Sequence, residues 1–147
     1  MKKYKKIPTA GSVMTPFPYS VDTDAGVTEV ERLIKRHNIH HIPVQQEGRV
    51  VGIISEGELN RTIDRLLPNM DKARFRARDI MLEDPYVVPF EAPLSEVALE
   101  MAKRRTGSAI VVHHEKLAGI LSATDICRLL AEILDAEFSG PTEDDAA

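Results

Sequence analysis

Apolar residues recur at helical spacing in two stretches of this chain. In each stretch they lie three or four positions apart, and basic residues follow at the end, where they complement the helix dipole. Glu29 stands near the start of the first stretch and Pro93 opens the second, both of which suit a first helical turn. The pattern predicts two amphipathic helices, built on Val27, Val30, Leu33 and Ile34 and on Leu94, Val97, Ala98 and Met101.

After each of these helices comes a pair of runs rich in valine, isoleucine and leucine, as in strands with a buried face. The first pair covers residues 41–44 and 49–54, with a turn at Glu47-Gly48, and the second covers 109–112 and 117–121. Each pair is followed by another helical pattern. Its apolar positions are Leu59, Ile63, Leu66 and Leu67, ended by Pro68, and then Ile126, Leu129, Leu130, Ile133 and Leu134.

The two halves match one another at a fixed offset of 67 residues, the step from Gly52 to Gly119. A self-match of this kind indicates one structural unit present twice. The same offset relates Met14 to Met81, Pro18-Tyr19 to Pro85-Tyr86, Val30 to Val97, and Arg61 to Arg128.

The segment from Gly119 to Asp125 suits a nucleotide ligand. The start of a helix offers unpaired N–H groups and the positive end of the dipole, which a phosphate can occupy. Ser122 and Thr124 add hydroxyl donors there. An ionised Asp125 accepts hydrogen bonds and so suits the hydroxyls of a ribose. The glycine allows backbone or ligand to approach closely.

Helix capping explains the same residues without a ligand. Ser55-x-x-Glu58 is a capping box and Ser122-x-x-Asp125 is nearly one. Such a cap stabilises a helix by about 1 kcal/mol. The local pattern alone favours this interpretation, although a cap can also be shared with a ligand.

The full pattern resembles a tandem pair of CBS domains, also called a Bateman module. Each copy runs from Val13-Met14 or Ile80-Met81 through a short strand near Val21 or Val88, and the first copy enters its middle strand at residues 40–44. The resemblance covers residues 7–135. It implies a mixed α/β (α+β) fold of two pseudo-symmetric β-α-β-β-α repeats that pack through their sheets and leave two clefts, which in the family often bind adenosine-containing ligands.

The resemblance also implies which residues face each cleft. The first cleft would be formed by residues of both repeats, namely Ile120, Ser122, Thr124 and Asp125 together with Tyr19, His40, His41 and Pro43. A weaker second cleft would be formed by Ser55, Glu58, Tyr86 and Ser108.

Three departures from the family's pattern favour the Asp125 cleft as the adenosine site. Glu58 replaces the ribose-binding aspartate, and the extra methylene displaces its carboxylate. Gly57 lacks the hydroxyl that Thr124 supplies, and Ile110 stands in the place of Pro43. We therefore expect the Glu58 cleft to be weaker, altered or empty.

The resemblance divides the chain into a first repeat over 7–67, a linker over 68–76, a second repeat over 77–138 and a disordered acidic tail over 139–147. Ile7 to Val13 is expected to cross over and pack on the second repeat. The linker region is rich in positive charge, at Lys72, Arg74, Arg76 and Arg78. A solvated surface is the simple explanation for that charge, and phosphate binding is the alternative.

The 147 residues have ordinary globular composition and a net charge of −4, with a pI near 5.7, which argues against a nucleic-acid partner. No apolar run approaches the length of a membrane span, and no apolar segment follows the basic start, so a cytoplasmic protein is expected. The one cysteine, Cys127, lies at an apolar-periodic position and is predicted to be a buried thiol.

Metal binding and catalysis find little support. His40 and His41 would point to opposite faces of a strand, and His113-His114 falls at a predicted turn. Glu58 and Asp125 belong to separate clefts, and no Ser-His-Asp, Cys-His or phosphate-loop pattern occurs, so we expect neither a metal site, nor an enzyme, nor a required cofactor.

Two functions remain open. The first is a stand-alone regulatory sensor that binds AMP, ADP, ATP, NAD or S-adenosylmethionine and acts allosterically on a partner protein. The alternative is a structural module for dimerisation and protein interaction, with clefts filled by its own side chains. A homodimer is expected in either case, because in the family the helices after Ser55 and Ser122 line the dimer surface. The ligand, the occupancy of each cleft, the effector and the head-to-head or head-to-tail arrangement stay undetermined.

Overall fold

A computed structural model describes residues 6–66 and 69–139 of the chain. The helix predicted from Leu59 onward was expected to end at Leu67 and Pro68, which lie outside the described residues. The predicted tail beyond Ser139 also lies outside them. The elements are α1 (Ala10–Val13), β1 (Thr15–Pro16), β2 (Val21–Asp22), α2 (Val27–His37), β3 (His41–Gln46), β4 (Arg49–Ser55), α3 (Glu56–Leu66), a 3-10 turn η1 (Lys72–Arg74), α4 (Ala77–Ile80), β5 (Leu82–Glu83), β6 (Val87–Pro89), α5 (Leu94–Arg104), β7 (Ser108–His113), β8 (Lys116–Ser122) and α6 (Ala123–Phe138).

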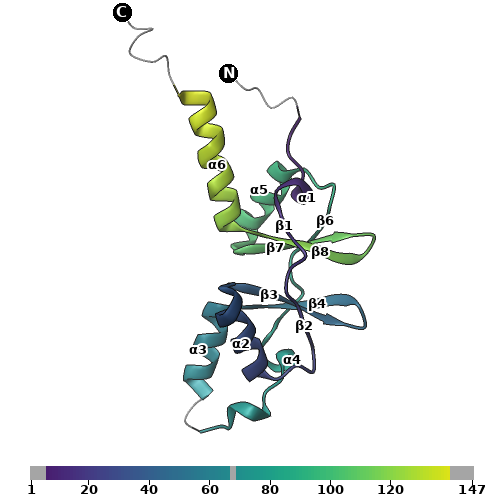
Figure 1. Cartoon of the computed structure of the whole chain (residues 1–147), viewed down its shortest axis with the longest axis vertical. Helices are drawn as coiled ribbons and strands as arrows, with labels where there is room; N and C mark the ends of the chain where they lie inside the picture. The colour runs from purple at the N-terminus through teal and green to yellow at the C-terminus, as the bar shows by residue number, and fades with distance from the viewer. Residues whose placement is uncertain (1–5, 67–68, 140–147) are drawn as a thin grey trace, which may run out of the picture.

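The strands form two four-stranded sheets of the same design. One has the order β2-β3-β4-β5 and the other β1-β8-β7-β6. Each contains a parallel pair, a central antiparallel hairpin and a short antiparallel edge strand. The sheets face one another across β4 and β8, with the longer helices on the outside (Figure 1). The predicted mixed α/β fold of two repeats packed through their sheets is therefore confirmed.

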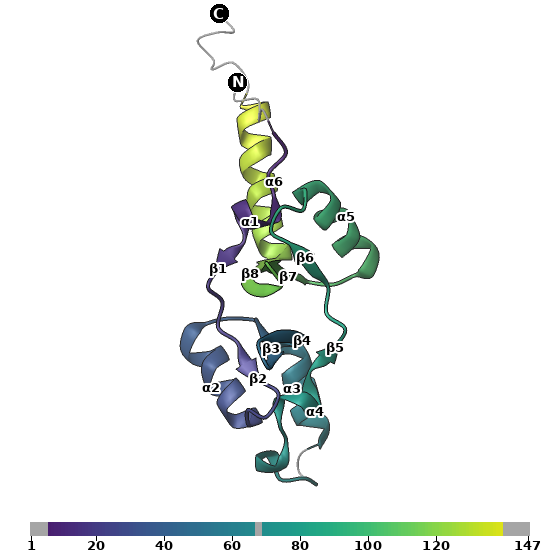
Figure 2. The same ribbon diagram turned by 90° about the vertical axis from the view of Figure 1, so that its right-hand side faces the viewer.

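The two repeats exchange their first segments. β1 precedes the first repeat but pairs with β8 of the second, and β5 precedes the second repeat but pairs with β4 of the first. Figure 2 shows the two crossing segments on opposite sides of the molecule. The predicted crossover of residues 7–13 is confirmed, since Ala10 is fully buried in the second core and its N–H donates to the Ala92 carbonyl at 2.8 Å. Ala77 takes the equivalent place in the first core.

The helices α2 and α5 are amphipathic, as predicted, and bury their apolar faces on the sheets. Each ends in a residue with left-handed backbone, Asn38 (φ 50°) and Arg105 (φ 54°). The hairpins turn through two residues of positive φ, Glu47-Gly48 and His114-Glu115. Paired positive φ angles give a turn the twist of the flanking strands, so the hairpins close tightly.

The helix α6 is less buried than its sequence suggests. Ile126 and Leu129 pack on the second core, but none of its residues is fully buried. Cys127 is exposed, so the prediction of a buried thiol was wrong. The reason is visible in Figure 1, where α6 runs away from its sheet. Its apolar periodicity therefore continues along a surface that the rest of the chain leaves uncovered.

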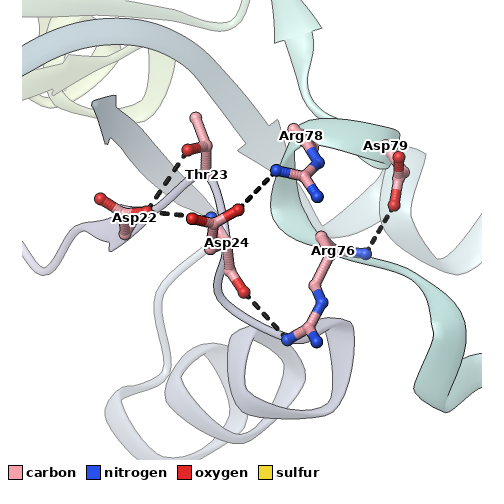
Figure 3. Close-up of polar contacts among 6 residues, drawn as sticks. All are labelled: Asp22, Thr23, Asp24, Arg76, Arg78 and Asp79. Atoms are coloured by element: carbon pink, nitrogen blue, oxygen red, sulfur yellow. Dashed lines mark hydrogen bonds and ion pairs between the residues drawn. The ribbon is translucent and has the colours of Figure 1, made fainter. Parts of the chain in front are cut away.

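Two of the basic residues near the linker hold the crossing segment on the first repeat (Figure 3). The Arg76 guanidinium donates to the Asp24 carbonyl at 3.1 Å, and Arg78 pairs with the Asp24 carboxylate. Backbone bonds reinforce the contact, from Ala77 N–H to Ala25 and from Arg78 N–H to Thr23. These charges thus serve a structural contact in addition to facing solvent.

Candidate functional site

A cleft of about 440 Å³ lies where the start of α6 meets the first repeat. The second repeat contributes the end of β8 and the first turns of α6, and the first repeat contributes the end of α2 and the start of β3. The crossing strand β1 adds a hydroxyl to the cleft wall. The lining residues are Thr15, Asn38, Ile39, His40, His41, Ile120, Ser122, Thr124, Asp125 and Arg128. Because residues more than 80 positions apart in sequence line one cleft, only tertiary packing creates it.

Asp125 is held in a reciprocal cap at the start of α6. Its carboxylate Oδ2 accepts from the Ser122 N–H at 2.8 Å and from the Ser122 hydroxyl at 2.9 Å, and Ser122 Oγ accepts from the Asp125 N–H at 3.1 Å. The other oxygen, Oδ1, lies 3.5 Å from the Arg128 guanidinium. The cap therefore orients the carboxylate and leaves Oδ1 as the oxygen more available to a donor in the cleft.

The capping expectation was wrong in one respect. The serine and glutamate of the first repeat, Ser55 and Glu58, were expected to form the full capping box, and the second pair only an approximate one. In the structure Ser55 Oγ accepts from the Glu58 N–H at 3.3 Å, but the Glu58 carboxylate pairs with Arg61. A neighbouring guanidinium offers a charged partner, which a backbone N–H does not.

Two histidines form the wall of the Asp125 cleft that belongs to the first repeat. His40 Nδ1 lies 2.6 Å from the Glu56 carboxylate, which can accept its N–H. His41 is largely enclosed, and burial lowers the pKa of its imidazole, with a further lowering from His40 and an opposing effect from Asp125. We expect His41 to be neutral near pH 7, when one ring nitrogen can donate and the other accept.

A second cleft of about 490 Å³ is related to the first by the pseudo-symmetry. Ser55, Glu58 and Ile53 take the places of Ser122, Asp125 and Ile120. Three arginines also line it, Arg61 from α3 and Arg104 and Arg105 from the end of α5. His41 lines both clefts. Its ring lies against Gly107, with Nε2 3.5 Å from where a β-carbon would stand.

The structure places the other predicted residues as follows. Ser108 is buried and lines the Glu58 cleft. Tyr19 lies outside the lining of either cleft and stacks on His37, with ring centroids 3.8 Å apart. Pro43 is enclosed in the core at the middle of β3. Tyr86 lies beneath the Arg104 guanidinium, 4.5 Å from the ring centroid, and its pKa is raised by burial and by Glu100, against an opposing effect of Arg104.

Several lining residues were missed by sequence reasoning. The 67-residue offset could have found them, because they occupy equivalent positions in the two repeats. The pairs are Thr15 with Leu82, Asn38 with Arg105, Ile39 with Thr106, and Arg128 with Arg61. The side chains differ in the first three pairs, so similarity did not single them out, whereas Arg61 and Arg128 are identical and were found as part of the repeat without being assigned to a cleft.

Within residues 6–66 and 69–139, no three histidine, cysteine or acidic side chains gather as ligands for a metal ion. In the same part of the chain no helix has both the length and the apolar character needed to cross a bilayer.

The chain is similar to proteins of known sequence and structure. It is 33% identical over 122 residues to a zinc metalloprotease of Methanocaldococcus jannaschii, an alignment that covers 83% of this chain and 32% of that protein. The chain spans about a fifth to a third of the length of the first curated relatives it matches. Their complete activities therefore involve sequence that has no counterpart here.

Two solved structures share the fold over most of the chain. A putative acetoin utilization protein from Vibrio cholerae superposes with a TM-score of 0.76 at 20% identity, covering 92% of this chain and 99% of that one. A CBS domain pair in complex with 5′-methylthioadenosine and S-adenosylmethionine superposes with a TM-score of 0.75 at 24% identity, covering 86% and 98%. The sequence profile of the CBS domain matches residues 10–65 and again residues 77–132. With both halves matched and the paired-sheet fold in place, the chain belongs to the CBS domain family as a tandem pair.

Proposed function

We propose that the chain is a regulatory module that binds an adenosine-containing ligand in the Asp125 cleft and passes its occupancy to a partner protein. The observation that carries the proposal is the meeting of Ser122, Thr124 and Asp125 with His40 and His41 in one cleft formed by both repeats. A ligand there would touch both repeats and could favour one relative pose over another. Such differential binding is what regulation by a ligand requires.

The chemistry of the cleft suits each part of an adenosine ligand. Asp125 Oδ1, whose contact with the Arg128 guanidinium is 3.5 Å long, can also accept from a ribose hydroxyl. Ile39 and Ile120 offer apolar contact to a base. The hydroxyl of Thr124 and the guanidinium of Arg128 can donate to a phosphate or another acceptor. The N–H groups of Ala123 and Asp125 at the start of α6 already donate to the Gly107 carbonyl and to Ser122 Oγ.

The comparison with known structures supports the ligand class. The related CBS domain pair holds 5′-methylthioadenosine and S-adenosylmethionine, both adenosine compounds. We carry over the adenosine part alone, and retain AMP, ADP, ATP, NAD and S-adenosylmethionine as the candidates. Cytoplasmic location and a homodimer are further parts of this proposal, the dimer because α6 leaves an apolar surface uncovered.

Thermal unfolding with millimolar amounts of each candidate, followed by calorimetric titration, tests the proposal. A ligand at 100 times its dissociation constant adds about 2.7 kcal/mol of stability, which moves the midpoint of such a domain by roughly 2–8 °C. We expect the shift in the wild type and in Glu58→Ala, and its loss in Asp125→Ala.

The Asp125→Ala variant also loses its cap, which lowers the stability of the unliganded protein by about 1 kcal/mol. The quantity to compare is therefore the shift that the ligand induces in each variant. Asp125→Asn keeps the shape and one acceptor oxygen, and so separates the cap from the charge. A shift of equal size in wild type and Asp125→Ala would contradict the proposed site.

A structural and dimerisation module is the second candidate. Two observations favour it: Asp125 already has partners of its own in the cap, and the exposed apolar residues of α6 suit protein contact. This function predicts a firm dimer and no stabilisation by any of the adenosine compounds. A monomer at micromolar concentration would exclude it.

A further inference from the structure

His41 belongs to the wall that the two clefts share. Of the side chains that line either cleft, it alone lines both. It stands at the start of β3, paired with Ser55, and its ring reaches across to Gly107 of the second repeat. At the equivalent position the second repeat has Ser108, which is buried and does not ionise. The common wall therefore holds one ionisable ring, and only the first repeat supplies it.

The ring nitrogens of His41 are available to a ligand. Within residues 6–66 and 69–139 neither has a hydrogen-bond partner, whereas the neighbouring His40 lies 2.6 Å from Glu56, and neither is fully buried. A neutral imidazole offers one donor and one acceptor, and a protonated imidazole offers two donors and a positive charge. A ligand in either cleft would therefore meet a wall whose charge depends on a single proton.

We propose that His41 selects ligands by their charge, because a proton on its ring adds a positive charge to the wall that both clefts share. This inference rests on the proposed function, since it concerns an adenosine compound bound between the repeats. While the ring is neutral, it should discriminate little between anionic and cationic adenosine compounds. Once the ring is protonated, it should favour an anionic compound and disfavour a cationic one.

The charged groups on the Asp125 side of the ring act in both directions. The Asp125 carboxylate favours a proton on His41, and His40 disfavours it. Arg128 lies 3.5 Å from Asp125 Oδ1 and offsets part of that negative charge, while Glu56 lies beside His40. Asp125 is thus both the proposed contact of the ligand and the carboxylate that supports the proton. Ligand and proton would therefore influence one another at this point.

The charged groups on the Glu58 side are mainly positive. One carboxylate and three guanidinium groups line that cleft, Glu58, Arg61, Arg104 and Arg105. Like charges oppose a further proton nearby. Burial acts in the same direction and lowers the pKa of His41. We therefore expect the ring to be neutral near pH 7 and to take up its proton below about pH 6.5, with an anionic ligand making that uptake easier.

His40 is the other histidine of the Asp125 cleft, and the structure favours it less. Its side chain is 68% exposed and lies beside Glu56, so that a proton there is balanced by a carboxylate and screened by water. His41 is largely enclosed between the repeats, where a charge acts through a lower dielectric. His40 also lines one cleft rather than both.

Calorimetric titration at about pH 7 and about pH 5.5 tests the proposal. The probes are NAD, S-adenosylmethionine and 5′-methylthioadenosine, which are anionic, cationic and neutral and keep their charges over this range. The variant His41→Gln retains a donor and an acceptor but cannot take up a proton. His114→Asn is the control, because His114 also ionises, lines neither cleft and has a left-handed backbone that asparagine tolerates.

We expect the lower pH to strengthen NAD binding to the wild type by roughly threefold or more and to weaken S-adenosylmethionine binding by a similar factor, as linkage to one proton predicts. Binding of 5′-methylthioadenosine should change little. His41→Gln should bind all three compounds like the wild type at about pH 7 and lose the two opposite responses. His114→Asn should behave like the wild type at both pH values.

Opposite responses of the same size in the wild type and His41→Gln would overturn the proposal. Responses of NAD and S-adenosylmethionine in the same direction would also overturn it, since a charge on the wall must act on them in opposite ways. A response that His40→Gln removes and His41→Gln retains would assign the charge to His40 instead. Failure of the function proposed for the Asp125 cleft looks different: none of the three compounds binds at either pH, and the selectivity of His41 falls with it.

Discussion

The Met14 side chain lies directly against Gly119, so that a β-carbon at position 119 would collide with the Met14 sulfur and stand 2.8 Å from the Thr15 carbonyl oxygen. The same relationship recurs between Met81 and Gly52, where a β-carbon would stand 3.0 Å from the Leu82 carbonyl oxygen. The glycine that begins each motif therefore makes room for the crossing segment of the other repeat.

Replacing Gly119 or Gly52 should destabilise the packing of the crossing segment against the other repeat. We expect Gly119→Ala to lower the free energy of unfolding by about 1–3 kcal/mol, the usual cost of overpacking, with Gly52→Ala close behind. Urea denaturation measures both.

Gly57→Ala is the control for those glycine variants, because a β-carbon there meets no atom closer than 3.7 Å. It should stabilise α3 by about 0.5–1 kcal/mol through helix propensity. If Gly119→Ala proves as harmless as Gly57→Ala, the close contact with Met14 does not limit the packing.

The environment of His41 should make stability depend on pH. Burial and His40 lower its pKa below the unfolded value, while Asp125 opposes the shift. The unfolded state then binds the proton more tightly, so stability is full above about pH 6.5 and falls as the pH drops toward the folded pKa. Every tenfold weakening of proton binding costs the folded state about 1.4 kcal/mol below both pKa values.

The variant His41→Ser isolates the contribution of His41 to the pH dependence of stability. Serine is the residue at the equivalent position of the second repeat, Ser108. Unfolding would be followed at about pH 7.5 and pH 5.5, on either side of the ordinary histidine pKa. We expect the wild type to lose more stability between these two values than the variant does. The same loss in both proteins would assign the pH dependence to groups other than His41.

The apolar face of α6 should mediate the proposed dimer. Leu130, Leu134 and Phe138 lie four residues apart and are 52%, 45% and 77% exposed. Leu134→Glu would place a charge on this face, and we expect it to shift a dimer toward monomer at micromolar concentration. Sedimentation equilibrium measures the change.

Leu99→Glu is the matched control for α6, since Leu99 is 59% exposed on α5 and lies apart from the α6 stripe. The control should sediment like the wild type. A wild-type protein that is monomeric throughout, or a dimer that Leu99→Glu disrupts equally, would place the interface elsewhere.

The contact between Asp24 and Arg78 should contribute little by itself. Both side chains are more than half exposed, and exposed ion pairs are worth about 0–1 kcal/mol. We expect Arg78→Gln to change the free energy of unfolding by less than about 1 kcal/mol. A larger loss, measured in urea at moderate salt, would show that the crossing segment depends on this pair more than on its backbone bonds.

Sequence reasoning could find what repeats along the chain or alternates within it. A helix or strand with one buried face leaves a regular pattern of apolar positions. Such patterns occur from Val27 to Ile34 and in the β3–β4 hairpin, and the same patterns return 67 residues later. They predicted the two repeats, the long helices, the hairpins and the Asp125 region of the cleft. The family resemblance supplied the packing of the sheets.

Tertiary structure decided the rest, because contacts between distant segments leave little local pattern. The strands β1 and β5 have two residues each, too few to show alternation, and each pairs with a strand of the other repeat. Cys127 follows the apolar period of α6, yet whether such a face is covered depends on where the helix leaves the sheet. His41 lines both clefts only because the two repeats bring their strands together at its ring.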